Sequence, residues 1–201
     1  MVDTIIFDIG QVLVHFRWRE YIKELGFDEV TSRNLEKATV LSSWWQKIDL
    51  GMAKEEYENG MKAAHPELSK ELNIFFSNTK RIVEPYDYSE DLIRQLKEKG
   101  YRVYLLSNYG DFLYHESVDR FHFRNYVDGE LISYQVQCIK PDHRIYQTLF
   151  EQYGIDPTKA LFVDDMEANI VAAKELGLNG ILFTSYERLL HEFAQYEIKL
   201  E

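Results

Sequence analysis

The sequence predicts an α/β fold built on a parallel sheet, with a helical segment inserted after the first strand. Short, almost continuously apolar runs that end in polar residues alternate with longer stretches in which apolar residues recur at helical spacing, and this alternation is typical of a parallel α/β sheet. Residues 15–82 differ, because they keep helical spacing and contain no convincing parallel strand. We therefore expect a helical insertion there, with the chain returning to the sheet around residues 84–86.

Four apolar runs are the candidate strands of the sheet. They are short and apolar at nearly every position, as expected of parallel strands whose two faces are both covered by helices. Each run ends in a polar residue or is followed at once by one, which marks the turn toward the next helix. The four runs are residues 4–8, 102–107, 160–164 and 180–183.

The helices that connect these strands have recognisable ends. We expect one helix to begin at Ser89, whose hydroxyl can cap it, and to end before Gly100. A second helix is expected over residues 143–153 and a third over residues 167–176, each followed by a glycine that can end it. Apolar residues recur on one face of each helix, so each can pack against the sheet.

Composition and charge exclude several classes of protein. Apolar residues make up 45% of the 201 residues, which is enough for a substantial core. The formal net charge of −11 argues against a nucleic acid or an anionic membrane as a partner, since both attract basic surfaces. We expect neither a signal peptide nor a transmembrane helix, and the single cysteine, Cys138, is expected to be a packing residue. These features favour a cytoplasmic protein.

Four polar segments, three of them at the ends of apolar runs, occur in an order that indicates phosphoryl-transfer chemistry. Parallel sheets bind ligands at the carboxyl ends of their strands, so these segments are expected to meet. Each segment alone has a more ordinary explanation, as a helix cap, a turn or a solvated side chain. Their occurrence together and in order favours a site. The segments are Asp8, Ser107-Asn108, Lys140-Pro141 and Asp164-Asp165.

We expect Asp8 to attack phosphorus as a nucleophile and a magnesium ion to hold the acidic residues together. Neighbouring carboxylates repel one another unless a cation neutralises them, and Mg²⁺ prefers oxygen ligands. Asp8 and Asp164 are the first candidates as metal ligands. Asp165 can bind the ion directly or through water, and the Gly10 carbonyl can serve as a main-chain ligand.

The remaining polar residues are candidates for binding the phosphate. The Ser107 hydroxyl and the Asn108 backbone N–H can donate hydrogen bonds to phosphate oxygens. Lys140 supplies a positive charge for the phosphate or for the Asp8 carboxylate. Ser107 and Lys140 are therefore expected to assist Asp8 in catalysis as well as in binding.

These segments resemble the four motifs of the haloacid dehalogenase-like hydrolase superfamily, which consists mostly of phosphatases. The resemblance rests on residues 7–13, on Ser107-Asn108 and on residues 140–177, which include Asp164-Asp165 and Asn169. Within the superfamily, the pattern is most similar to sugar-phosphate phosphatases related to α-D-glucose-1-phosphate phosphatase and to the phosphatase half of soluble epoxide hydrolases.

The resemblance implies a Rossmann-like core domain of residues 1–14 and 83–201 and a helical cap domain of residues 15–82. It also implies a magnesium-dependent phosphatase that forms an aspartyl-phosphate on Asp8. The substrate would be a small phosphorylated metabolite, for which a sugar phosphate is one candidate. The cap residues Trp44, Trp45 and Lys47 would then help to shape the substrate pocket.

One position departs from the family pattern. Most phosphatases of the superfamily have a second aspartate two residues after the nucleophile, where it acts as general acid and base, but this chain has Gly10. A positioned acid or base typically contributes about 10²–10⁴-fold to the rate. We therefore expect weak activity that favours good leaving groups, and we expect Gly10→Asp to raise the turnover of simple alkyl phosphates. Gln11 and His15 are nearby candidates for compensation.

Three other functions stay open at this stage. A 2-haloacid dehalogenase also uses an aspartate nucleophile and a lysine, but it attacks carbon and needs no metal. A phosphomutase would form an isomer instead of inorganic phosphate. A non-catalytic module would bind a phosphate or a partner without turnover. Fold alone does not decide among these functions, and the sequence leaves the oligomeric state undetermined.

Overall fold

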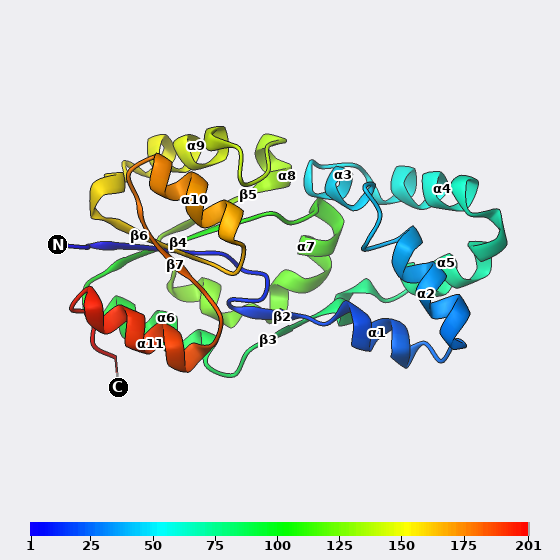
Figure 1. The fold of residues 1–201 in the computed structure, drawn as a ribbon, viewed down its shortest axis with the longest axis horizontal. Helices are drawn as coiled ribbons and strands as arrows, with labels where there is room; N and C mark the ends of the chain where they lie inside the picture. Colours follow the sequence, from blue (N-terminus) through cyan, green and yellow to red (C-terminus); the bar gives the residue numbers. More distant parts are fainter. Residues whose placement is uncertain (201) are drawn as a thin grey trace.

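The computed structural model describes residues 1–200 and contains a five-stranded parallel sheet with the strand order β5-β4-β1-β6-β7 (Figure 1). The predicted α/β fold is therefore confirmed. In the described part of the chain, no helix is long and apolar enough to cross a membrane. The strands are β1 (Thr4–Phe7), β4 (Arg102–Ser107), β5 (Gly129–Ile132), β6 (Ala160–Asp164) and β7 (Asn179–Leu182).

Helices cover both faces of this sheet (Figure 1). One face is covered by α6 (Ser89–Glu98) and α11 (Tyr186–Gln195), and the other by α9 (His143–Tyr153) and α10 (Glu167–Glu175). Successive side chains of β1 point to opposite faces: Ile5 and Phe7 belong to the core cluster on the α6 side, and Ile6 to the cluster on the α9 side. Both clusters are apolar, which explains why the strands are apolar at every position. Cys138 is buried in the second cluster, as expected of a packing residue.

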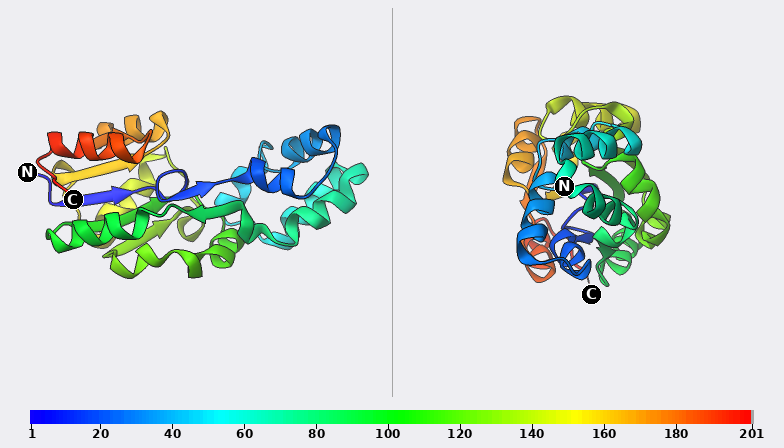
Figure 2. Two further views of the ribbon diagram at one scale, coloured as in Figure 1. Left: turned by 90° about the horizontal axis from the view of Figure 1, so that it is seen from below. Right: turned by 90° about the vertical axis from the view of Figure 1, so that its right-hand side faces the viewer.

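The inserted segment begins and ends with a two-stranded antiparallel ribbon. The ribbon pairs β2 (Val14–Phe16) with β3 (Val83–Pro85), and five helices lie between these strands in the sequence. Figures 1 and 2 show the helices gathered at the end of the molecule opposite the termini. The division into a core domain and a cap domain stays a prediction. The helices are α1 (Trp18–Glu24), α2 (Glu29–Ala38), α3 (Trp45–Asp49), α4 (Lys54–Ala64) and α5 (Ser69–Phe76).

Short helices of the core meet the inserted segment. α7 (Asp111–Ser117) follows β4, and α8 (Ser133–Val136) follows β5. The Lys54 Nζ atom of α4 lies 2.6 Å from the Glu116 Oε1 atom of α7, so an ion pair joins the two parts. Five short 3₁₀ segments complete the fold: Pro66–Leu68, Thr79–Ile82, Val118–Arg120, His122–Tyr126 and Pro157–Lys159.

The structure confirms the predicted glycines after the C-termini of the three connecting helices, but not the predicted cap at Ser89. Gly100, Gly154 and Gly177 follow the three helices, and each adopts the positive φ that only glycine tolerates well. Ser89 is the first residue of α6 and not its cap. Its buried hydroxyl donates to the Leu13 carbonyl at 2.6 Å, so it fixes the helix to the chain after β1. The prediction of a Ser89 cap was wrong.

Three strands were not predicted from the sequence, and others differ by one residue at an end. β5 was not predicted, and neither was the short β2–β3 ribbon, whose strands of three residues flank the inserted helices. β7 runs from Asn179 to Leu182, one residue earlier than predicted at each end. The ribbon starts within one residue of the predicted boundary of the insertion, so the chain leaves and re-enters the core as a paired strand.

Candidate active site

The sheet places Asp8 and Asp164 side by side at its carboxyl edge. Phe7 of β1 is level with Val163 of β6, so the next residues of the two strands are Asp8 and Asp164. The Asp8 backbone N–H donates to the Val163 carbonyl at 2.9 Å, which extends the pairing as far as this acid. Asp8 is 7% exposed and Asp164 is fully buried. Two acidic side chains therefore lie together, almost closed off from solvent.

Lys140 provides the positive charge between them. Its Nζ atom lies 2.9 Å from Asp8 Oδ1 and 2.6 Å from Asp164 Oδ2, and it donates to the Leu106 carbonyl at 2.8 Å. Burial lowers the pKa of Lys140, but the charges of Asp164 and Asp8 outweigh burial and raise that pKa above its ordinary value. For Asp8, burial prevails over the attraction of Lys140 and raises the pKa. The lysine is therefore protonated and fixed against both acids.

The oxygens of Asp164 are already engaged by the protein. Oδ1 accepts from the Met166 backbone N–H at 2.8 Å and from Asn169 Nδ2 at 2.9 Å. Oδ2 accepts from Lys140, and Asn169 Nδ2 lies 3.0 Å from it. Tyr146 donates to the Asn169 carbonyl at 3.0 Å and so secures that residue in turn. Asp164 thus holds Lys140 in position.

Asp165 is in a different situation. Among the described residues, no hydrogen bond or ion pair joins its side chain to another residue. One oxygen each of Asp8, Asp164 and Asp165 lies within 4.8 Å of the others. Burial, and then the charges of Asp8 and Asp164, raise the pKa of Asp165 to about 7. A hard cation would relieve this repulsion, and a donor set made only of oxygens fits Mg²⁺.

Ser107 and Asn108 lie where β4 ends beside β1. The Asn108 side chain donates to the Lys140 carbonyl at 2.9 Å and accepts from the Lys140 backbone N–H at 2.8 Å. These two bonds attach the loop that contains Lys140 to the end of β4. Ser107 is buried, and its hydrogen bond to Asp8 partly offsets the effect of burial on the pKa of that acid. The predicted contacts of Ser107 and Asn108 with phosphate stay predictions.

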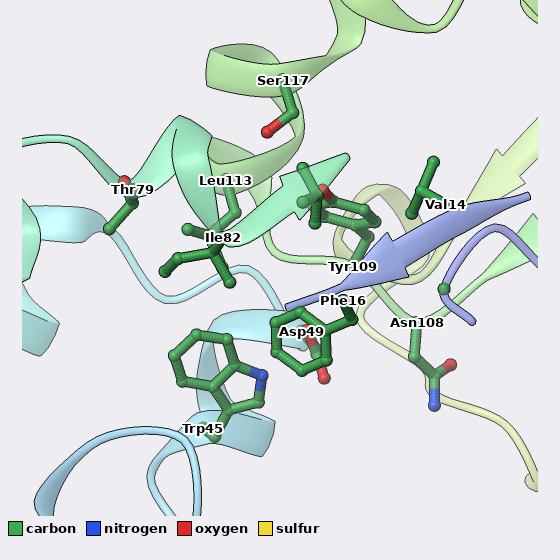
Figure 3. A pocket seen from close by; sticks show the side chains of 12 residues that line it. Val14, Phe16, Trp45, Asp49, Thr79, Ile82, Asn108, Tyr109, Leu113 and Ser117 are labelled. Carbon is green, nitrogen blue, oxygen red and sulfur yellow. The ribbon is translucent and has the colours of Figure 1, made fainter. Parts of the chain in front are cut away.

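A cavity opens next to this cluster, between the sheet edge and the inserted helices (Figure 3). It contains about 470 Å³ of space free of atoms, part of it open to solvent. Gly10 and Asn108 line it on the side of the acidic cluster. Most of the other lining side chains are apolar or aromatic, and they come from the ribbon and the 3₁₀ turn before β3, from α3, from α7 and from the loop that precedes α7. The full lining consists of Gly10, Val14, Phe16, Trp45, Asp49, Thr79, Ile82, Val83, Asn108, Tyr109, Leu113 and Ser117.

Asp49, the last residue of α3, is the site residue that the sequence did not reveal. It is half-buried in the cavity wall, and burial, followed by the charge of Asp8, raises its pKa to about 7. Its sequence neighbourhood resembles any amphipathic helix end, so no local signal marks it. Only the packing of α3 against the core brings it to the site.

The other residues suggested for the pocket or for compensation lie in different places. Trp45 lines the cavity, whereas Trp44 is outside the lining and has the Lys47 Nζ atom 3.6 Å from its ring centroid. His15 stacks on a tyrosine of the loop after β3 and is also outside the lining. The Gln11 side chain donates to a backbone carbonyl of β2. In this structure, therefore, neither Gln11 nor His15 faces the cavity.

The chain belongs to the haloacid dehalogenase-like hydrolase family, whose model matches residues 2–177. The sesquiterpene phosphatase astK of Aspergillus oryzae is 26% identical over 183 residues, covering 89% of this chain and 88% of that protein. The D-ribitol-5-phosphate phosphatase of Bacteroides thetaiotaomicron is 26% identical over 192 residues, covering 88% and 89%. The family and the class of enzyme, a phosphoric monoester hydrolase, are thereby confirmed.

A solved structure shares both the fold and the predicted metal. The haloacid dehalogenase-family enzyme bt-2542 of Bacteroides thetaiotaomicron, in complex with magnesium and inorganic phosphate, is 25% identical to this chain, with a TM-score of 0.74. The alignment covers 94% of this chain and 99% of that one. The prediction of magnesium as the cofactor agrees with this complex.

Proposed function

We propose that this protein hydrolyses a small organic phosphate monoester, with Asp8 as the nucleophile and Mg²⁺ as the cofactor. The observation that carries the proposal is the position of Asp8, which pairs with a buried lysine, belongs to the acidic cluster with Asp164 and Asp165, and lies next to a cavity. A carboxylate so placed can attack phosphorus while cations neutralise the incoming phosphate. The aspartyl-phosphate that forms on Asp8 is then hydrolysed by water.

The residues divide into a metal-binding set and a positioning set. The side-chain oxygens of Asp8 and Asp165 and the carbonyl of Gly10 are the proposed metal ligands. Asp164 is a weaker candidate as a direct ligand than the sequence suggested, because its oxygens are engaged by Lys140, Asn169 and a backbone N–H. When bound, magnesium would screen the charge of the phosphate and orient it for attack.

Lys140 and Ser107 complete the proposed site around the nucleophile. Lys140 holds the Asp8 carboxylate by an ion pair of 2.9 Å, and its positive charge would attract a phosphate bound at that carboxylate. The Ser107 hydroxyl and the Asn108 backbone N–H are proposed to donate to the remaining phosphate oxygens. This arrangement follows the general rule that phosphoryl transfer is catalysed mainly by positioning and by charge stabilisation.

The cavity supports a substrate with an apolar organic group. The leaving group would lie against Val14, Phe16, Ile82 and Leu113, whose side chains cannot form hydrogen bonds with the hydroxyls of a sugar. The Trp45 ring beside them offers a single N–H donor. The similar proteins include both a sesquiterpene phosphatase and a D-ribitol-5-phosphate phosphatase, so apolar and polyol phosphates are both reasonable to test. The lining favours the apolar class over the sugar phosphate suggested by the sequence.

Phosphate release from a substrate panel tests the proposal. The panel contains alkyl, terpenyl, aryl and sugar phosphates, assayed with Mg²⁺ and with EDTA, beside the Asp8→Asn variant. We expect release that requires magnesium, that is lost in Asp8→Asn and that is fastest for apolar substrates. Activity that survives Asp8→Asn would exclude Asp8 as the nucleophile. Chloride release from 2-haloacids without metal, in place of phosphate release, would instead indicate a dehalogenase.

A further inference from the structure

We propose that Asp49 is the general acid and general base of this reaction, supplying from the inserted segment the group for which Gly10 has no side chain. The inference rests on the phosphatase function proposed above. It assigns a catalytic role to a carboxyl that is remote in sequence from every motif residue. Three features of the structure support it: the place of Asp49 in the cavity, the contacts that fix its helix to the core, and its electrostatic surroundings.

The first feature is position. Gly10 lies two residues after Asp8 and lines the cavity, so a substrate whose phosphorus faces Asp8 directs its leaving oxygen into this space. Asp49 lines the same cavity from the inserted segment, at the end of α3. Among the described residues of the lining, Asp49 has the only carboxyl group. Figure 3 shows its side chain among those that surround the cavity.

The second feature is the attachment of Asp49 to the core. The buried Ser133 hydroxyl donates to the Asp49 carbonyl at 2.6 Å and accepts from the Tyr109 backbone N–H at 3.0 Å. One serine therefore joins the end of α3 to the residue that follows Asn108. Gly110 adds a close approach, because a Cβ atom there would overlap the side chain of Ile48. The core thus fixes the backbone of α3 at the position from which Asp49 reaches the cavity.

The third feature is the balance of charge around Asp49. Burial is the main reason that the pKa of Asp49 is raised to about 7, the charge of Asp8 raises it further, and Lys140 opposes the shift. Tyr57 and Tyr109 are the other titratable groups that face it. A carboxyl that titrates near neutral pH can both donate and accept a proton during one turnover.

Asp49 donates a proton when the aspartyl-phosphate forms and accepts a proton when it is hydrolysed. In the first step, an Asp8 oxygen forms a bond to phosphorus, the bond from phosphorus to the leaving oxygen breaks, and the Asp49 proton moves to that oxygen. In the second, water attacks the phosphorus, its proton moves to the Asp49 carboxylate, and the bond from phosphorus to Asp8 breaks. The products are an alcohol and inorganic phosphate, and both side chains return to their initial states.

The leaving group distinguishes this role from a structural one. We compare kcat/KM for an alkyl phosphate and for p-nitrophenyl phosphate in the wild type and in Asp49→Asn, with the exposed cap acid Glu56→Gln as the control. An alkoxide requires a proton and nitrophenolate does not, so the variant should lose about 10²–10⁴-fold on the alkyl phosphate and less than about tenfold on the aryl phosphate. Equal losses on the two substrates would overturn the inference.

A second variant tests the same role by moving the acid. A Cβ atom at Gly10 would have no atom within 4 Å, so Gly10→Asp can be accommodated. Gly10→Asp returns a carboxyl to the cavity. In the Asp49→Asn background it should therefore raise kcat/KM for the alkyl phosphate by at least about tenfold over that of Asp49→Asn alone. A folded double variant that recovers nothing would count against a missing proton donor.

The pH profile separates this inference from the proposed function. Wild-type kcat/KM for the alkyl phosphate should fall above pH of about 7, where Asp49 loses its proton, and this fall should be absent in Asp49→Asn. If the fall is the same in both proteins, Asp49 is not the acid, although the phosphatase function stands. If the wild type releases no phosphate, or releases it without Asp8, the proposed function fails and this inference fails with it.

Discussion

Three carboxyl groups, one in the cavity wall and two in the adjacent acidic cluster, are held in surroundings that disfavour their charged forms. Burial is the largest cause of the raised pKa of Asp8, Asp49 and Asp165. A raised pKa makes such a carboxyl suited to proton transfer near neutral pH. It also lowers the free energy of unfolding, because the group is harder to ionise in the folded state than in the unfolded chain. Lys140 offsets this cost for Asp8 but does so only weakly for Asp49, which is outside its ion pairs.

Replacing Lys140 should therefore destabilise the protein as well as inactivate it. Lys140→Met leaves Asp8 and Asp164 buried beside each other without their cation, so we expect the free energy of unfolding to fall by about 3 kcal/mol. Urea unfolding without magnesium measures this change. Lys37→Met, at an exposed position, serves as the control. A loss no larger than that of the control would show that the buried ion pairs contribute little.

Asp49→Asn should have the opposite effect on stability, and only at higher pH. Because the pKa of Asp49 rises from 3.8 to about 7 on folding, the unfolded state binds fewer protons between these values and wild-type stability falls as the pH rises. Asparagine does not titrate, so the free energy of unfolding of the variant should exceed that of the wild type at pH 8. Because Asp49 is partly exposed to solvent, we expect a difference of about 1–3 kcal/mol. Near pH 4 the variant should gain nothing. Urea unfolding at the two pH values in EDTA checks this. A difference independent of pH would contradict it.

The residues at the strand ends could be located from the sequence, and Asp49 could not. Asp8, Asp164 and Ser107 follow or end buried apolar runs, and the carboxyl ends of parallel strands necessarily meet at one edge of the sheet. Asp49 reaches the same site through the packing of a five-residue helix, and no periodicity in the sequence encodes that contact. The roles of Asp164 and Asp165 also required the structure, because only the hydrogen bonds distinguish them.

At the scale of elements, the strands that were missed lack the apolar signal of the others. β4 and β6 are buried along nearly their whole length, and the sequence predicted both within their observed bounds. β5 is an edge strand whose first two residues, Gly129 and Glu130, are only partly buried. Arg124 pairs with Glu130 at 2.6 Å, so a charged residue is stable there, but its presence conceals the strand.

The contact between α3 and Gly110, the residue before α7, should be sensitive to one added methyl group. In Gly110→Ala the new Cβ atom would overlap the Ile48 side chain and lie 3.2 Å from its carbonyl oxygen, so α3 must move away from the core. We expect the movement of Asp49 to lower kcat for alkyl phosphates by at least about tenfold, because small displacements of a catalytic group are costly. Steady-state kinetics checks this, with Ile48→Ala as a partial rescue. Unchanged kinetics in Gly110→Ala would show that α3 tolerates the displacement.

At the scale of the whole molecule, the inserted helices and the sheet are joined by a narrow connection and by packing. Only the β2–β3 ribbon links them through the backbone, as Figure 2 shows. One apolar cluster nevertheless extends from Ile5 of the sheet to Tyr57 and Phe75 of the insertion. The Lys54–Glu116 ion pair adds a contact between the parts, and Thr79 also donates to Glu116. The cavity lies at this junction, so substrate binding and the relative position of the two parts are coupled.

Magnesium should raise the stability of the whole molecule through the acidic cluster. An ion that binds only the folded state at about 100 times its Kd adds about 2.7 kcal/mol to the free energy of unfolding. For a chain of this length, that gain corresponds to a rise of roughly 5–10 °C in Tm. Asp165→Asn removes an unpaired carboxylate of the cluster and should abolish most of this rise, whereas Asp119→Asn, at an exposed site, should leave it intact. Differential scanning calorimetry with MgCl₂ and with EDTA measures all three proteins. A magnesium-dependent rise that persists undiminished in Asp165→Asn would exclude Asp165 as a ligand and transfer that role to Asp164.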